Sequence, residues 1–205
     1  MTDSDHSKPA EVEIIQRENC FKGFYRLDRV HLRHELFAGG MSKTISREVF
    51  VRHDAVCALP YDPIRDELVL IEQFRVGPLG KASNPWLIEM VAGLIDKDEV
   101  PEEVARREAV EEAGLEFTEL WPIIQYFPSP GGSDEFVHLY LGRCDSRGAG
   151  GLHGLEEEGE DIRVRVWPFA EALQALHEGK IINGAAIIAI QWLALHRDEV
   201  RGVWT

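Results

Sequence analysis

The stretch Gly93–Leu115, GLIDKDEVPEEVARREAVEEAGL, predicts a short helix that carries more carboxylates than a helix needs. Pro101 suits the first turn of a helix, where its missing N–H costs nothing, and Gly114 suits the C-terminal stop. We therefore expect a helix over residues 101–113. Three alanines on one face of this helix are expected to pack inward: Ala105, Ala109 and Ala113.

Three glutamates of this helix fall on a common face. At 100° per residue, Glu108, Glu111 and Glu112 lie within one arc of about 100°. Like charges at positions i and i+4, as in Glu108 and Glu112, repel each other, and a bound cation reverses that cost. The alternative interpretation is a solvated helix face on which Arg107 pairs with Glu111.

The spacing of the residues around the helix separates these two interpretations. Five residues separate Gly93 from Glu99, and seven separate Glu99 from Arg107-Glu108-Ala109; Glu111-Glu112 and Gly114-Leu115 then follow at one-residue gaps. This pattern resembles the Nudix box, the signature of the Nudix hydrolases, at each specified position. The resemblance implies a loop–helix–loop that holds divalent cations beside a pyrophosphate linkage. Mg²⁺ is the expected cation, with Mn²⁺ as the alternative, because both accept hard oxygen ligands.

Composition narrows the function classes. The 205 residues, 44% of them hydrophobic, suffice for one good core, alone or with an appendage. The net charge of −14 argues against a nucleic-acid surface, which needs a basic stripe. The three cysteines form an odd set without metal-ligand spacing, and no apolar stretch has the length of a signal peptide core or a membrane span. We expect a cytoplasmic protein with no membrane partner.

The first 52 residues predict a small antiparallel β subdomain. Residues 1–11 are polar and acidic, and we expect them to be disordered. Three strands are then expected over residues 12–16, 22–37 and 42–52, with a turn at Gly39-Gly40. Three strands with little helix to cover them have only marginal stability on their own. The subdomain should therefore pack on the main domain, on a second subunit, or on both. The alternative is an N-terminal meander of the main sheet.

Residues 53–205 alternate strands and helices, which predicts an α/β fold, specifically an α/β/α sandwich. The strands are expected over 55–59, 67–76, 86–91, 120–127, 135–142 and 163–167, and further helices over 170–178 and 183–196. The prolines of Pro60-Tyr61-Asp62-Pro63 favour a turn between the first two of these strands.

Four further segments resemble the ADP-ribose pyrophosphatase branch of the Nudix family, in the same order and at compatible spacing. They are LIEMVAGLIDKDE (87–99), SPGGSDE (129–135), GLEEEGEDIRV (154–164) and INGAAIIAIQWL (182–193), and the likeness extends over roughly residues 20–196. The resemblance implies hydrolysis of ADP-ribose to AMP and ribose 5-phosphate. It also implies a homodimer in which the N-terminal strands exchange between subunits.

The same resemblance implies a role for individual residues. The implied metal ligands are the backbone carbonyl of Ala92 and the side chains of Glu108, Glu112 and Glu160. Glu158 is the implied base that takes a proton from water. Because acidic residues crowd this loop, a shift of one residue would move that role to Glu157. Glu111 is expected to bind metal through water or to support the site, and Arg107 is expected to orient the glutamates.

Substrate contacts are implied in the same way. Guanidinium groups bind phosphate and aromatic rings stack on a purine. The resemblance implies that Arg47, Arg52 and Arg75 contact phosphates and ribose, and that Phe24 and Tyr25 lie around the adenine; an ordinary surface or core role is the alternative for Arg52 and Tyr25. Glu48 accompanies Arg47, and these two residues and both aromatics would come from the partner subunit. The pocket would also include Glu135, at the terminal ribose, with Leu94, Ser129, Pro130 and Gly131.

Two other functions remain open from the sequence. One is hydrolysis of a different nucleoside diphosphate sugar, such as GDP-mannose, since no motif reads the base directly. The other is a catalytically silent sensor of ADP-ribose, which the presence of all three box glutamates disfavours.

Overall fold

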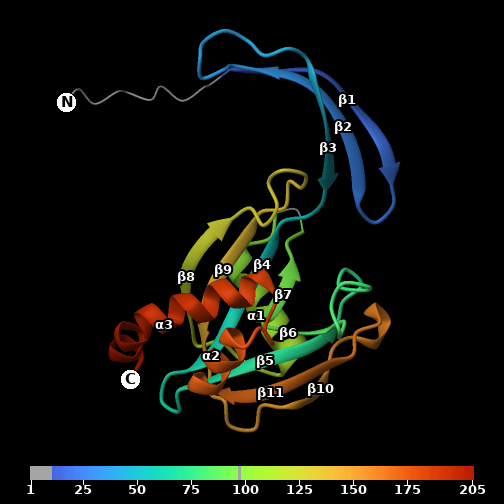
Figure 1. Cartoon of the computed structure of the whole chain (residues 1–205). Coiled ribbons are helices and arrows are strands. Elements are labelled where there is room, and N and C mark those ends of the chain that lie inside the picture. Colours follow the sequence, from blue (N-terminus) through green and yellow to red (C-terminus); the bar gives the residue numbers. More distant parts are fainter. Residues whose placement is uncertain (1–10, 97) are drawn as a thin grey trace, which may run out of the picture. The chain divides into compact units, whose positions relative to one another are not determined.

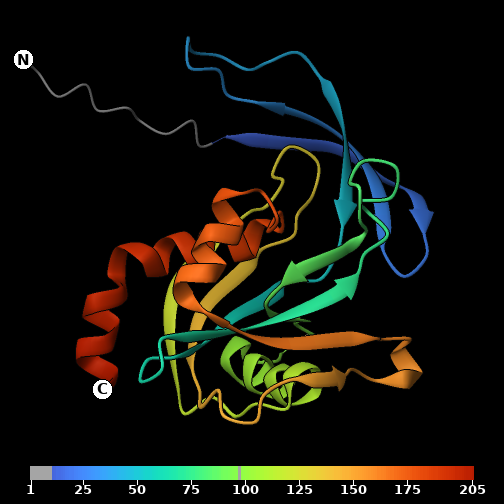
Figure 2. The same cartoon turned by 60° about the horizontal axis from the view of Figure 1, so that its bottom comes forward.

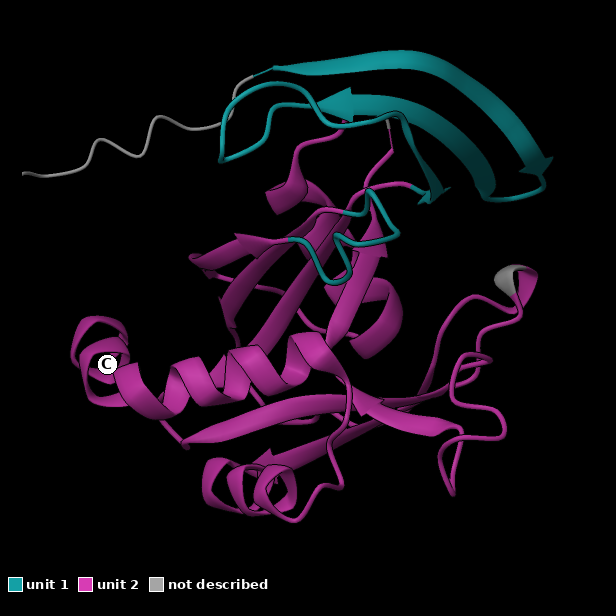
Figure 3. Cartoon of the chain, turned by 45° about the horizontal axis from the view of Figure 1, so that its top comes forward, with its two compact units in different colours: residues 1–52, 127–135 teal, residues 53–126, 136–205 magenta. Residues whose placement is uncertain are grey.

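The computed structural model describes residues 11–96 and 98–205, without the side chain of Glu158. The chain forms two compact units (Figure 3). The first contains the described residues up to Arg52 together with residues 127–135, and the second contains residues 53–126 and 136–205. The expected disorder of residues 1–10 lies outside the described residues. The Glu11 carbonyl accepts a hydrogen bond from the Glu35 N–H at 3.0 Å, and the expected disorder of this residue stays a prediction.

The first unit is a three-stranded antiparallel sheet in the order β1-β2-β3 (Figure 1). Its strands are β1 (Val12–Lys22), β2 (Arg26–His34) and β3 (Ile45–Val51). The loop of residues 127–135 joins it, since the Phe50 N–H donates to the Gly132 carbonyl at 2.8 Å. The turn at Gly39-Gly40 is confirmed, with φ of 86° and 78° at the two glycines.

Strand boundaries in this unit differ from those expected, since the second strand covers Arg26–His34 rather than residues 22–37, and the third covers Ile45–Val51 rather than residues 42–52. The first strand does not stop at residue 16 but continues to Lys22, and its pairing with β2 passes two irregularities. The chain reverses instead at Gly23–Tyr25, where the Gly23 N–H donates to the Tyr25 carbonyl at 2.8 Å.

The second unit is built on a mixed sheet with helices on both faces. The strand order is β10-β11-β5-β4-β9-β8, with β6 on β5 and β7 on β4. Figure 2 shows α1 on one face and α2 and α3 on the other. The elements are β4 (Ala55–Asp62), β5 (Glu67–Phe74), β6 (Trp86–Glu89), β7 (Val91–Leu94), α1 (Pro101–Ala113), β8 (Glu119–Tyr126), β9 (Val137–Arg143), β10 (Gly151–His153), a 3-10 turn η1 (Glu156–Glu158), β11 (Ile162–Pro168), α2 (Phe169–His177) and α3 (Gly184–Trp204).

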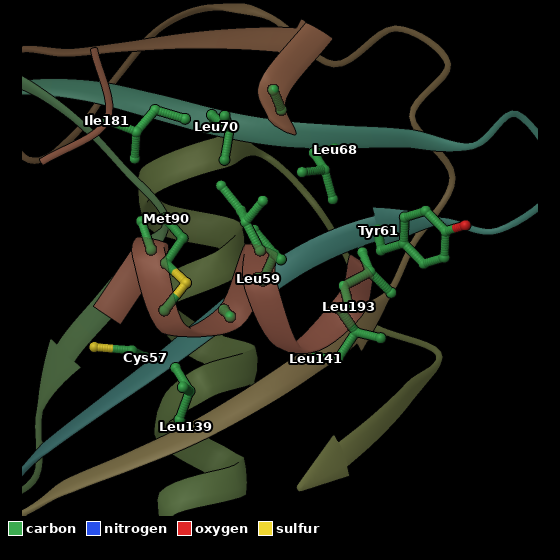
Figure 4. Packing of buried hydrophobic residues seen from close by; sticks show 14 of the residues in the cluster. Cys57, Leu59, Tyr61, Leu68, Leu70, Met90, Leu139, Leu141, Ile181 and Leu193 are labelled. Atoms are coloured by element: carbon green, nitrogen blue, oxygen red, sulfur yellow. The ribbon is translucent and has the colours of Figure 1, made fainter. Parts of the chain in front are cut away.

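Alternate residues of the central strands enter two separate cores. In β4, Cys57 and Leu59 pack toward α2 and α3 (Figure 4), whereas Val56 and Ala58 pack toward α1. This two-sided burial explains why β4 and β5 read as nearly continuous apolar runs. The expected α/β/α sandwich with an N-terminal antiparallel sheet is confirmed.

Several boundaries in this unit differ from those expected. β4 runs through Pro60 to Asp62, because Pro60 falls between the residues that pair with β7 and those that pair with β5, where its missing N–H is tolerated. The expected strand 86–91 is two strands, since β6 pairs with β5 and β7 with β4. The short strand β10 lies in a segment where no strand was expected, and α3 extends eight residues beyond the expected end at residue 196.

The close packing on the α1 face gives a stability prediction. A methyl group added at Gly142 of β9 would overlap the ring of buried Phe117, so Gly142→Ala should lower the free energy of unfolding by about 1–3 kcal/mol. Gly202 of α3 has open space around its Cα, so Gly202→Ala should instead raise it by about 0.5–1 kcal/mol. Urea unfolding followed by circular dichroism measures both. Equal effects of the two substitutions would contradict the packing described.

Candidate active site

The acidic helix is the element around which the site forms. α1 spans Pro101–Ala113, as expected, and Gly114 ends it in the left-handed conformation with a φ of 62°. The Leu115 N–H then donates to the Ala109 carbonyl at 2.9 Å, which closes the last turn. The three alanines expected to pack inward are each at most 1% exposed. Because alanine is small, the helix lies close to the sheet, and its glutamates reach the strand before it.

Glu108 lies directly against the backbone of β7. A Cβ atom at Gly93 would overlap the Glu108 carboxylate, so only glycine at this position leaves room for that side chain. The glycine at the start of the motif thus forms a cradle for a carboxylate. Arg107 contacts the same carboxylate, with its Nη1 2.9 Å from Glu108 Oε1 and 3.0 Å from Glu111 Oε2.

Glu112 is the most deeply buried carboxylate of the helix, at 2% exposure. Its Oε2 accepts a hydrogen bond of 2.9 Å from the backbone N–H of Ala92. Burial raises the pKa of Glu112 to about 8, and repulsion from Glu108 and Glu160 adds to the shift against the Ala92 hydrogen bond. Burial likewise raises the pKa of Glu108 to about 7, with repulsion from Glu111 and Glu160 opposing the attraction of Arg107.

Glu160 completes this group of carboxylates, which we call the carboxylate cluster: Glu108, Glu112 and Glu160. The Glu160 side chain is held by the Leu155 N–H, which donates to its Oε2 at 3.2 Å. Its charge contributes to the raised pKa of both helix glutamates, so the fold brings the three within electrostatic range. Across residues 11–96 and 98–205, no group of three or more His, Cys, Asp or Glu side chains is arranged so that it could hold a metal ion as it stands.

The donor set nevertheless fits a hard divalent cation. Carboxylate oxygens are ligands of the kind that Mg²⁺ and Mn²⁺ prefer. The raised pKa values of Glu108 and Glu112 mean that the ionised forms of these two side chains are disfavoured without a compensating positive charge. The metal-ligand roles of the carboxylate cluster and of the Ala92 carbonyl, and the supporting role of Glu111, stay predictions.

A second arginine approaches the cluster from β5. Arg75 donates from Nε and Nη2 to Oε2 of Glu89, at 3.0 and 2.8 Å. Glu89 is 4% exposed and also accepts from Nδ2 of Asn183 at 3.1 Å. The sequence analysis gave Glu89 no function. A buried carboxylate in a strand that leads into an acidic motif is the signal that points to it.

Glu158, the residue expected to act as the base, lies two residues before Glu160 of the carboxylate cluster. The backbone of Glu158 ends the 3-10 turn η1, which Gly159 terminates with a φ of 70°. The Glu158 side chain lies outside the described part of the structure. Glu157, the alternative base, is exposed on the same turn.

Within the first unit, four of the expected substrate residues come together. Arg52 forms an ion pair with Glu135 at 3.2 Å, and its guanidinium lies 5.0 Å from the centre of the Tyr25 ring. The Phe24 ring packs edge-on against Tyr25 and remains 78% exposed. An arginine over an aromatic ring beside a carboxylate provides groups that can contact a nucleoside.

The other expected substrate residues have more ordinary surroundings. Arg47 is exposed and donates to the Ser46 carbonyl, and Glu48 pairs with Arg29 at 3.1 Å. The Ser129 carbonyl accepts from the Gly132 and Ser133 N–H groups in the exposed loop that contains Pro130 and Gly131. Leu94 ends β7 half-buried. The substrate roles of all these residues stay predictions.

The fold and the carboxylate cluster together define an α/β sandwich protein with an acidic loop–helix–loop site. The NUDIX domain model matches residues 51–187, and the chain belongs to the Nudix family of hydrolases. Nudix hydrolases generally use a divalent metal ion. No helix in the described ranges has the length and apolar character needed to cross a lipid bilayer.

Curated relatives match nearly the whole chain. The ADP-ribose pyrophosphatase of Escherichia coli K12 is 48% identical over 95% of this chain and 93% of its own length. That of Haemophilus influenzae is 40% identical over 100% of this chain and 95% of its own. A GDP-mannose pyrophosphatase of Klebsiella pneumoniae is 38% identical over 72% of this chain and 74% of its own. A crystal structure of an ADP compounds hydrolase superposes with a TM-score of 0.66 over 92% of this chain and 97% of its own, at 21% identity, which shows a shared fold.

The buried charge of the site predicts a gain in stability on its removal. In metal-free protein, the raised pKa of Glu112 means that stability is full below its ordinary value of 4.5 and falls as pH rises toward 8. Glu112→Gln retains an acceptor for the Ala92 N–H but removes this charge. In EDTA at pH 8.5 it should raise Tm by about 2–4 °C, the shift that roughly 1 kcal/mol gives in a chain of this size. At pH 5 the gain should disappear.

Differential scanning calorimetry at both pH values measures this effect. Glu103→Gln, at an exposed position of the same helix, is the control and should change Tm little at either pH. A lower Tm for Glu112→Gln at pH 8.5 would show that the carboxylate is stabilising even without a cation.

Proposed function

We propose that this protein hydrolyses the pyrophosphate bond of ADP-ribose and releases AMP and ribose 5-phosphate in the presence of Mg²⁺. The observation that carries the proposal is 48% identity to ADP-ribose pyrophosphatases over 95% of the chain. The buried, cation-demanding carboxylates on α1 support it independently, because a hydrolase of this family needs such a cluster.

The chain's own residues support a division of labour in the reaction. Divalent cations, when bound, would neutralise the pyrophosphate charge and lower the pKa of water. Glu108, Glu112 and Glu160, with the Ala92 carbonyl, would hold them. Arg107 orients Glu108 and Glu111 by direct ion pairs, so its contribution is positional rather than chemical.

Hydrolysis of the pyrophosphate requires a group that accepts a proton from the attacking water. The oxygen of a water molecule attacks one phosphorus, the bond from that phosphorus to the bridging oxygen breaks, and the second phosphate leaves with the bond's electron pair. Glu158 would take the proton that water loses. Its place on a glycine-terminated turn, two residues before Glu160, supports this role.

The first unit supports a homodimeric assembly, which we also propose. Several apolar side chains of β1 are more than half exposed, among them Val12, Ile14 and Phe21. Burial of such exposed apolar side chains is favourable, and a second copy of the chain that covers β1 would provide it. The exchange of strands between subunits stays a prediction, and sedimentation velocity on the purified protein distinguishes dimer from monomer.

A second substrate has its own support. GDP-mannose pyrophosphatases match 72–73% of the chain at 36–38% identity, below the values for the ADP-ribose enzymes in both respects. ADP-ribose is therefore the first substrate to test.

Product analysis of the purified protein tests the function directly. With Mg²⁺ and a panel of ADP-ribose, GDP-mannose, ADP-glucose and NADH, we expect a strong preference for ADP-ribose, formation of AMP, and complete loss of turnover in EDTA. Preference for GDP-mannose would retain the metal site and overturn the substrate. Absence of hydrolysis across the panel would favour a sensor.

The identity of the base gives a separate prediction. Glu158→Gln should lower kcat by more than 100-fold with little change in KM, because loss of a proton acceptor acts on the chemical step. Glu157→Gln is the matched control on the same turn and should retain kcat within a few-fold. A larger loss for Glu157→Gln would move the role by one residue.

A further inference from the structure

Arg75 is the arginine that reaches the carboxylate cluster from the sheet rather than from the helix. Its positive charge acts on Glu112, whose pKa it lowers, and its own pKa is raised by Glu89 first and then by Glu112 and Glu160, against the effect of burial. Its hydrogen-bond partner Glu89 lies three residues before Ala92, whose N–H donates to Glu112 Oε2 at 2.9 Å, so a substrate phosphate bound at the cluster would meet this guanidinium. The question is what fixes its position.

Glu89 fixes the guanidinium from one side. Both of its hydrogen bonds from Arg75 converge on Oε2, and Glu89 is 4% exposed while the Arg75 side chain is 42% exposed. A guanidinium has five N–H donors. Glu89 uses two of them, and no other hydrogen bond within the described ranges engages the group. The remaining three are available to a ligand on the exposed side.

Asn183 fixes Glu89 in turn. Its Nδ2 donates to Glu89 Oε1 at 3.1 Å, while its Oδ1 accepts from the Ala186 N–H at 3.0 Å and so caps α3. Both carboxylate oxygens of Glu89 are thereby engaged. The chain of contacts runs from the N-cap of α3 through β6 to the residue that follows β5, and Asn183 lies 94 residues from Glu89 in the sequence.

We propose that Glu89 and Asn183 are positioning residues that hold Arg75 beside the carboxylate cluster, with its free N–H donors presented to a phosphate group of the substrate. This inference rests on the proposed function and adds two residues to it. Without Glu89, the guanidinium would be drawn toward the negative charge of Glu112 and Glu160, where it would compete with the cation and no longer present its donors outward.

A purely structural ion pair is the competing explanation. A buried carboxylate with an arginine partner often only joins two strands, and removing one partner leaves the other buried and unpaired. The two explanations differ in what they predict for substrate binding. A structural pair affects Tm alone, whereas a positioning pair affects affinity through Arg75.

The experiment measures binding and turnover together. Full-length variants would be assayed with ADP-ribose and Mg²⁺, and titrated calorimetrically with the non-hydrolysable α,β-methylene analogue of ADP-ribose. Glu89→Gln should weaken analogue affinity and raise KM by about tenfold, the lower end of what loss of an orienting partner costs. Asn183→Ser keeps an N-cap oxygen but loses the amide donor, and should weaken affinity about threefold.

A double-mutant cycle tests whether Glu89 acts through Arg75. In an Arg75→Ala background, Glu89→Gln should cause no further loss of affinity. If Arg75→Ala fails to fold, Arg75→Lys, which keeps the charge without the forked donor set, serves as background. Glu72→Gln is the matched control, because it breaks the Glu72–Arg163 ion pair on β5 without touching Arg75, and should leave affinity unchanged.

Three results would overturn the inference. They are wild-type affinity in Glu89→Gln, an equal loss in Glu72→Gln, and a full additional loss from Glu89→Gln in the Arg75→Ala background. Failure of the wild type to bind or hydrolyse ADP-ribose would overturn the proposed function itself. That outcome is separable, since it is seen before any variant is compared.

Discussion

The burial of like-charged carboxylates between a helix and a sheet is the constraint on which the rest of the site depends. Glu108 and Glu112 are one turn apart on α1, and both have their pKa raised by burial and by negative neighbours. A protein can tolerate this arrangement only if the backbone is shaped to receive the side chains. The glycine at position 93 provides the space for one, and the Ala92 N–H provides a hydrogen bond to the other.

The packing behind the helix makes this burial inescapable. Small residues on the inner face of α1 let it approach β4 and β7 closely, and the left-handed turn at Gly114 ends it before it can diverge from the sheet. Because the inner face is apolar and tightly packed, the helix cannot rotate to release its glutamates into water without exposing that core. The cost of burying these charges therefore offsets part of the stability that packing of the α1-side core provides, and a bound cation would neutralise the charges.

Local signals explain which parts could be predicted from the sequence. Pro101 and Gly114 act within one turn of the helix ends, so the helix boundaries and its inward alanines were predicted correctly. Pro60 led to a wrong strand end, because whether a strand tolerates a proline depends on which strands flank it. That is set by sheet topology rather than by local sequence. The same holds for Glu89, whose partners Arg75 and Asn183 lie 14 and 94 residues away.

The net charge of −14 affects how the site can attract an anionic ligand. An acidic protein repels a pyrophosphate at long range, so attraction must come from groups fixed at short range, where screening by salt is weakest. Arg107 pairs with Glu108 and Glu111 of its own helix. Arg75 differs, because its partner Glu89 lies on the sheet and occupies one side of the guanidinium only. An arginine anchored from behind keeps donors for an anion in front, and this asymmetry is how one ion pair can serve a negatively charged ligand in a negatively charged protein.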